Sequence, residues 1–200
     1  MDDLEKTLIV LSTQRRHFCP RQVLGARIGL AGAAALELPT HRHDRRLIAI
    51  VEMDGCFADA VEAATGCSVG HRTLRVADYG KVAATFIDRR TETAVRLAPR
   101  PGIRLLARDY APEETKLYYA QLAGYQRMPL ETLLDIQTVS LNDSLQKWIS
   151  RAGVRVNCQM CGEEILNERE VVIDGRVICL SCAGDSYYTV VKDNRGSWLA

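Results

Sequence analysis

The 200-residue sequence lacks three features that would each indicate a class of protein. No apolar run reaches the roughly 18–20 residues that a membrane-spanning helix needs. The first residues, MDDLEKTL, are acidic where a secretory leader is basic, and no small-residue cleavage site follows them. No P-loop, G-x-S-x-G or dinucleotide-binding glycine motif is present. We therefore expect a cytoplasmic protein, and no motif assigns it to one of these enzyme classes.

The chain also lacks a strong excess of positive or negative charge. The formal net charge is +1, and residues 154–200 carry five Lys or Arg against seven Asp or Glu. A protein that reads a phosphate backbone concentrates positive charge on one face. The balance disfavours nucleic acid as a partner, and it counts against a zinc-finger regulator.

The pattern of apolar residues predicts an α+β protein. Apolar side chains make up 47% of the chain, which is enough to build a core. Because helical and strand segments are mixed without regular alternation, we expect a mixed sheet with flanking helices in residues 1–153, and a small treble-clef-like zinc finger in residues 154–200. We expect helices over 3–14, 20–38, 56–66, 101–110, 112–125 and 143–152, and strands over 47–53, 73–77, 82–87, 94–98 and 133–139.

Three glycines recur on one face of the expected helix that begins at Pro20. Gly25, Gly29 and Gly32 are spaced by four and three residues, which is poor for helix propensity but leaves a smooth face. Close packing against another element explains the pattern better than contact with a ligand.

Four of the seven cysteines form two C-x-x-C pairs with 17 residues between them. Two such turns supply four tetrahedral thiolates, which is the usual arrangement of a structural zinc site. Iron–sulfur ligation is the main alternative, and two disulfides are disfavoured in a reducing compartment. The predicted zinc ligands are Cys158, Cys161, Cys179 and Cys182.

The segment between the pairs reads as a β-hairpin with Asp174-Gly175 at its tip. A short helix is expected over residues 180–188. Because so few residues cannot bury a sufficient core, bound metal has to supply the missing stability.

Three residues near the N-terminus form a second candidate site. Cys19 precedes Pro20 and Cys56 follows Asp54-Gly55, so each thiol is expected at the positive end of a helix dipole, which favours a thiolate. His17, Cys19 and Cys56 could therefore hold a divalent metal with one coordination position open. Buried structural cysteines are the alternative.

Two further residues are candidates for ligands of the same metal. A helix over 56–66 would place Cys67 roughly 16 Å along the axis from Cys56, beyond the reach of a shared ion. Asp59 lies one turn after Cys56 and could be a fourth ligand, although an exposed acid at a helix start is the commoner explanation.

Three blocks of this sequence resemble the signature blocks of the family formed by the E subunit of formylmethanofuran dehydrogenase. They are HFCPRQVLG (17–25), VEMDGCFADAVEAATGCSVG (51–70) and DYGKVAATF (78–86), and the resemblance covers roughly residues 4–187. It implies an α+β domain with a metal site on His17, Cys19 and Cys56, often in a homodimer. It also implies association with a molybdenum or tungsten redox complex related to methanogenesis, without independent dehydrogenase activity.

The sequence departs from the family pattern at several positions. Arg15 stands where the family has the first histidine of its H-x-H pair, Arg21 replaces a glycine, and His71 replaces a lysine. A fixed cation at Arg15 would help to keep thiolates ionised but would disfavour a divalent metal.

A few other polar residues are possible ligand-binding groups. Lys81, after the DYG turn, could bind a ligand near the site, or it could be a solvated lysine. His41 and His43 lie in an expected polar loop and could chelate metal, but an exposed loop explains them better. Besides an accessory protein, the sequence is compatible with a stand-alone metalloenzyme that uses the open coordination position.

Overall fold

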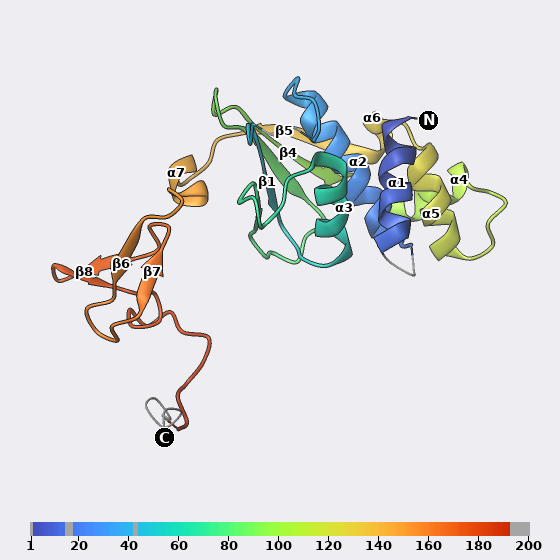
Figure 1. Ribbon diagram of the computed structural model, residues 1–200. Helices are drawn as coiled ribbons and strands as arrows, with labels where there is room; N and C mark the ends of the chain where they lie inside the picture. The colour runs from blue at the N-terminus through green and yellow to red at the C-terminus, as the bar shows by residue number, and fades with distance from the viewer. Residues whose placement is uncertain (1, 15–17, 42–43, 193–200) are drawn as a thin grey trace. The chain divides into compact units, whose positions relative to one another are not determined.

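The computed structural model describes residues 2–14, 18–41 and 44–192, and it confirms the α+β class (Figure 1). The chain divides into two compact units, Met1–Trp148 and Ile149–Ala200. Within the described residues, no helix has the length and apolar character needed to cross a membrane.

The first unit is built on a five-stranded mixed sheet in the order β2-β1-β3-β4-β5. Only β1 and β2 are parallel, and the other neighbouring pairs are antiparallel, with Ala49 opposite Phe86 and Phe86 opposite Val95. β1 and β3 are buried over their whole length, which explains why their sequences are continuous apolar runs. The strands are β1 (Leu47–Val51), β2 (Leu74–Val76), β3 (Ala84–Asp88), β4 (Ala94–Pro99) and β5 (Leu134–Val139).

Helices α1, α2 and α3 lie beside one another next to the sheet, and α4 and α5 form a pair farther along (Figure 1). The central helix, α2, contributes more buried residues than any other helix of the unit. The helices are α1 (Asp3–Gln14), α2 (Pro20–Ala35), α3 (Cys56–Thr65), α4 (Ile103–Tyr110), α5 (Leu117–Arg127), α6 (Leu130–Leu133) and α7 (Leu145–Ile149).

The glycine face of α2 packs closely, as predicted. A Cβ atom on Gly25 would lie 2.6 Å from the Phe57 carbonyl oxygen and 2.7 Å from the Ala60 Cβ. A Cβ atom on Gly29 would lie 2.7 Å from the Ala64 Cβ. The absence of side chains here therefore lets the α2 and α3 backbones approach each other.

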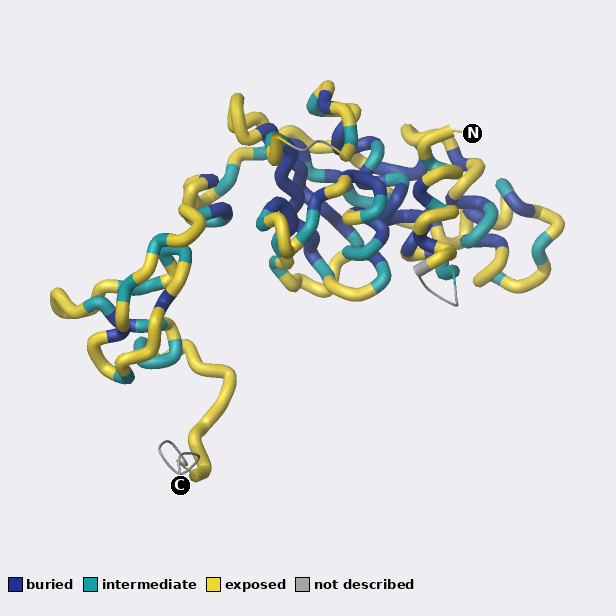
Figure 2. The backbone as a smooth tube through the Cα atoms, viewed as in Figure 1, coloured by how far each residue is buried: buried dark blue, intermediate teal, exposed yellow. Residues whose placement is uncertain are grey.

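The second unit contains two short hairpins. β6 (Arg155–Asn157) pairs with β7 (Glu164–Leu166), and β8 (Val171–Ile173) pairs with β9 (Arg176–Ile178). Three of its described residues form a buried cluster, namely Cys158, Ile165 and Ile178. Figure 2 shows the contrast in burial with the sheet and α2 of the first unit.

Two predicted helices differ from the structure. The prediction of a helix over residues 180–188 is wrong. The structure has a single turn there, in which Ala183 N–H donates to Cys179 O at 3.0 Å, and Gly184, with φ 97°, ends that turn. The helix expected over 143–152 shortens to Leu145–Ile149, because Ser150 adopts a left-handed conformation with φ 46°. The β6–β7 hairpin was not predicted.

Candidate metal centres

Cys19 is the N-cap residue of α2, as the sequence predicted. Its extended backbone (φ −128°, ψ 154°) precedes Pro20, whose missing N–H costs nothing in the first turn of a helix. The Cys19 N–H donates to Gln22 Oε1 at 2.9 Å, and Gln22 is completely buried. This hydrogen bond fixes the backbone that carries the thiol.

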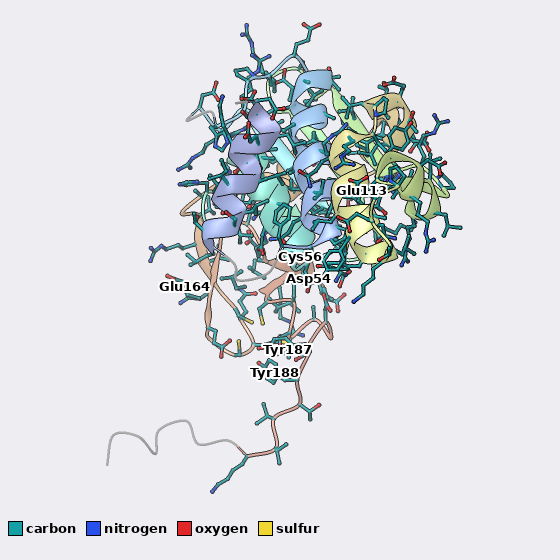
Figure 3. The ribbon with its side chains drawn as sticks, turned by 90° about the vertical axis from the view of Figure 1, so that its right-hand side faces the viewer. Asp54, Cys56, Glu113, Glu164, Tyr187 and Tyr188 are labelled. Atoms are coloured by element: carbon teal, nitrogen blue, oxygen red, sulfur yellow. The ribbon has the colours of Figure 1, made fainter. Side chains whose placement is uncertain are left out.

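Cys56 is the first residue of α3, and Figure 3 shows it close to Asp54 at that end of the helix. The turn before it requires Gly55, which has φ 70°. Because the glycines of α2 let the two helices approach, their N-terminal ends meet, and Cys19 Sγ lies 3.2 Å from Cys56 Sγ. Two half-buried thiols therefore face each other at two helix N-termini.

The separation of the two sulfurs allows them to share one metal ion. Two thiolates bound tetrahedrally to zinc lie about 3.8 Å apart, given the zinc–sulfur bond length. A disulfide requires a sulfur–sulfur distance of about 2.05 Å, so Cys19 and Cys56 are two free thiols. His17 and Arg15 lie outside the described residues. Within the described part of the chain, Asp59 does not complete a group of three ligands with the two cysteines.

Cys67 lies elsewhere, as the length of α3 predicted. It belongs to the hydrophobic core, is 3% exposed, and its thiol donates to Leu47 O at 3.4 Å. Burial raises the pKa of the Cys67 thiol. A separate cavity of about 320 Å³ is lined by Cys67, His41 and His71 among others. Cys67 is therefore a structural thiol, away from the Cys19–Cys56 pair.

A cleft of about 710 Å³ opens beside Cys19. Its walls come from the start of α2, the loop before β3, β4, the start of α4 and one face of α5. Lys81, which the sequence suggested as a ligand-binding residue, lines the same cleft. The structure thus brings Lys81 and Cys19 to one concave surface.

Sequence reasoning missed two residues of this region. The Tyr118 hydroxyl donates to Phe18 O at 2.9 Å, and burial, followed by the negative charge of Cys19, raises the pKa of Tyr118. No sequence signal connects residues 100 positions apart. Gln22 could have been found, because it stands three residues after the N-cap, where a capping-box side chain belongs.

The second centre is built by the two hairpins of the second unit. Cys158 directly follows β6, and Gly162 (φ 80°) allows the turn that returns Cys161 toward it. The tip of the second hairpin, Asp174-Gly175, has positive φ at both residues, as the predicted turn requires. That turn returns the chain so that β9 leads into the second C-x-x-C pair.

The four sulfurs of this centre all lie within 4.8 Å of one another, and the Cys161 and Cys179 sulfurs are 4.0 Å apart. The separation is close to the roughly 3.8 Å expected between tetrahedral zinc thiolates. Backbone N–H groups also point at the sulfurs, with Cys179 N–H donating to Cys158 Sγ and Cys182 N–H donating to Cys179 Sγ, both at 3.3 Å. The donor set and geometry fit one zinc ion.

The acid–base properties of these thiols favour a bound cation. The backbone N–H of Cys161, followed by those of Cys179 and Met160, lowers the pKa of Cys158 to about 6. The hydrogen bond with Cys179, followed by burial, raises the pKa of Cys182 to about 12. Four thiolates so close together repel one another unless a cation lies between them.

Comparisons with known protein families find a match for each of the two units. Residues 16–140 match the family described as "FmdE, Molybdenum formylmethanofuran dehydrogenase operon", and residues 151–188 match the "Prokaryotic dksA/traR C4-type zinc finger". The chain therefore belongs to the FmdE family, which confirms the resemblance seen in the sequence, and it carries a C4-type zinc finger.

Two individual proteins are similar to this chain. A protein from Syntrophus aciditrophicus, described as similar to the E subunit (FmdE) of tungsten formylmethanofuran dehydrogenase, superposes with a TM-score of 0.57 at 20% identity. The match covers 93% of this chain and 95% of that one, so the two share a fold. A curated relative from Archaeoglobus fulgidus, called a probable S-adenosyl-L-methionine-binding protein, is 29% identical. The alignment covers 88% of this chain but only 51% of the relative, so the chain spans about half of the relative's length.

Proposed function

We propose that this protein is a metal-binding accessory component of a molybdenum or tungsten redox complex, with no dehydrogenase activity of its own. The observation that carries the proposal is the pair of facing thiols, Cys19 and Cys56, in a domain of the FmdE family. The partner in this proposal is a formylmethanofuran dehydrogenase or a related enzyme, and the accessory protein acts as a cytoplasmic homodimer.

Within this proposal the two metal centres have different roles. Cys158, Cys161, Cys179 and Cys182 hold a zinc ion that stabilises the second unit, whose own buried cluster is small. His17, Cys19 and Cys56 hold a second divalent metal, which supplies Lewis acidity at one open position. This second centre has fewer thiolates, and Arg15 stands two residues before His17 in the sequence, so it is the weaker of the two.

The cleft beside Cys19 favours a second candidate function, a stand-alone metalloenzyme. About 710 Å³ next to a metal with an open position is enough space for a small substrate. In this alternative, Cys19 and Cys56 hold the metal and Lys81 orients the substrate.

The name of the archaeal relative suggests S-adenosylmethionine as a ligand. That molecule carries a sulfonium and an ammonium charge besides one carboxylate, so its net charge is positive, and acidic side chains would balance the two cations. Among the described residues, no aspartate or glutamate lines the cleft. We therefore do not propose S-adenosylmethionine as a ligand of this chain.

Purification of the tagged full-length protein from its native cells tests the accessory role. The proposal predicts that a molybdopterin-containing enzyme co-purifies with the protein. A Cys19→Ser/Cys56→Ser variant should recover less of that enzyme, because the metal centre contributes to the association in this proposal. Recovery of the protein as an isolated homodimer that turns over a substrate by itself would contradict the accessory role and support the metalloenzyme.

A further inference from the structure

The cleft beside Cys19 carries an excess of positive charge. Among the described residues, five cationic side chains line it and no aspartate or glutamate does. Two of the five are neutralised. Arg96 forms a two-pronged ion pair with Glu52, with N–O distances of 2.6 and 2.8 Å, and Arg100 lies 3.2 Å from Asp135.

The other three cations have no counter-charge among the residues that the structure describes. Arg21, Lys81 and Arg104 form no ion pair with any residue that the structure describes, and all three are exposed. They come from three separate segments: the first turn of α2, the loop before β3 and the first turn of α4. Charges of one sign gathered in a concave surface with low-dielectric walls create a potential that attracts anions.

A buried tyrosine lies in the same wall. Tyr125 lines the cleft and is only 2% exposed, and its hydroxyl is not one of the buried polar atoms that lack a hydrogen-bond partner. A tyrosine hydroxyl in the wall of a cleft offers a hydrogen-bond donor to a bound molecule. Arg104 lies close enough for its charge to affect the ionisation of Tyr125. An oxyanion held by Arg104 would be an acceptor for this hydroxyl.

The remainder of the lining is largely apolar. Leu24, Val82, Ala98, Pro99 and Ile103 contribute to the walls. Two helices, α2 and α4, also begin at the cleft, and the positive ends of their dipoles add to the positive potential. The cleft therefore suits a molecule with an apolar body and an anionic group.

We propose that this cleft binds a small organic anion, a carboxylate or phosphate ester with an apolar body. Arg21, Lys81 and Arg104 bind its anionic group and the Tyr125 hydroxyl donates a hydrogen bond to it, while the apolar walls cover the body. Binding requires no metal at Cys19 and Cys56, so it does not depend on the accessory role proposed above.

A matched series of naphthalene compounds tests the proposal on the full-length protein. The probes are 2-naphthoate, the neutral 2-naphthamide and the cationic 2-naphthylmethylamine, which share one apolar body and differ in charge. Titrations followed by amide chemical shifts should show 2-naphthoate binding about tenfold more tightly than 2-naphthamide, as one charge-assisted hydrogen bond provides. The amine should not bind, and added salt should weaken the binding of the carboxylate.

Substitutions in the lining test whether 2-naphthoate binds in the cleft. Arg21→Glu/Arg104→Glu should weaken 2-naphthoate binding by at least about tenfold, and Tyr125→Phe should weaken it by about threefold or more, corresponding to the loss of one hydrogen bond. Arg108→Glu, also on α4 but outside the cleft lining, is the matched control and should leave affinity unchanged. If the double variant misfolds, Lys81→Glu on the exposed loop replaces it.

Several outcomes would overturn the proposal. They are equal binding of the carboxylate and the amide, no binding of 2-naphthoate at millimolar concentration, or unchanged affinity in the charge-reversal variants. Tight binding of S-adenosylmethionine with no binding of 2-naphthoate would also overturn it. Repeating the titration with Cys19→Ser/Cys56→Ser separates the two proposals, because anion binding should survive the loss of the metal centre.

Discussion

At the residue scale, burial distinguishes the cysteines of the first unit from one another. Cys19 and Cys56 are half-buried at helix starts, whereas Cys67 is 3% exposed in the core. Reactive thiols in proteins are accessible and lie in positive surroundings, whereas buried thiols are inert. The same side chain therefore has a chemical role at two positions and a packing role at the third.

Alkylation of the metal-free protein should follow this order. We expect iodoacetamide to modify Cys19 and Cys56 at least about tenfold faster than Cys67 near neutral pH, because burial disfavours the Cys67 thiolate. Peptide mass spectrometry over time measures the three rates. Faster modification of Cys67, or inert Cys19 and Cys56, would show that the pair is structural and would remove the basis for a reactive centre.

The cysteine pair was predictable from the sequence because each thiol stands next to a strong helix-start signal. Pro20 and Gly55 fix where the two helices begin, and the glycine face of α2 fixes how closely they pack. Tyr118 and Tyr125 could not be predicted to line the cleft beside Cys19. Their position depends on how α5 packs against α2, and no local pattern encodes that contact.

At the element scale, the approach of α2 to α3 brings the two thiols together. We expect Gly25→Ala to destabilise the first unit by about 1–3 kcal/mol, because the new Cβ would meet the Phe57 carbonyl oxygen at 2.6 Å. The clash outweighs the roughly 1 kcal/mol that alanine gains over glycine in helix propensity. Chemical denaturation measures the loss.

An exposed position of the same helix provides the control for Gly25→Ala. Ala34→Leu adds more volume on α2 but faces solvent, so its effect should stay within about 0.5 kcal/mol. If Gly25→Ala changes the free energy of unfolding as little as this control does, α2 and α3 pack less closely than the structure shows. The explanation of how Cys19 meets Cys56 would then fail.

The zinc finger shows how much a spacing pattern can predict. The two C-x-x-C pairs predicted a four-cysteine cluster, because each short turn can direct two sulfurs toward one point. The same spacing does not determine the conformation of the residues after the second pair. Those residues form a single turn that ends at Gly184, where a helix was expected by analogy with treble-clef fingers. The backbone conformation of these residues, and not the cysteine spacing, therefore determines that no helix forms after the second pair.

At the scale of the whole molecule, the two units differ in how they are stabilised. Residues of the first unit form an extensive core around a five-stranded sheet, whereas the second has a buried cluster of three described residues. A unit of this size without a core depends on metal to fold. The two units should therefore respond differently to metal removal.

Chelation at neutral pH should unfold residues 154–190 while the sheet of the first unit stays folded. Amide hydrogen exchange, resolved by segment, measures the two units in one experiment. We expect fast exchange over β6–β9 and unchanged protection in β1 and β3. Unchanged exchange in the finger after zinc removal has been verified would contradict the claim that metal supplies its stability.

The presence of two separate metal centres in one chain can be tested by metal analysis of the purified protein and two variants. We expect one tightly bound zinc per chain that Cys158→Ser/Cys161→Ser abolishes and Cys19→Ser/Cys56→Ser leaves in place. A second, more weakly bound divalent metal should show the opposite dependence, and mild chelation should remove it first. A finger variant that keeps the full zinc content would contradict two separate centres, as would metal content that Cys19→Ser/Cys56→Ser leaves unchanged.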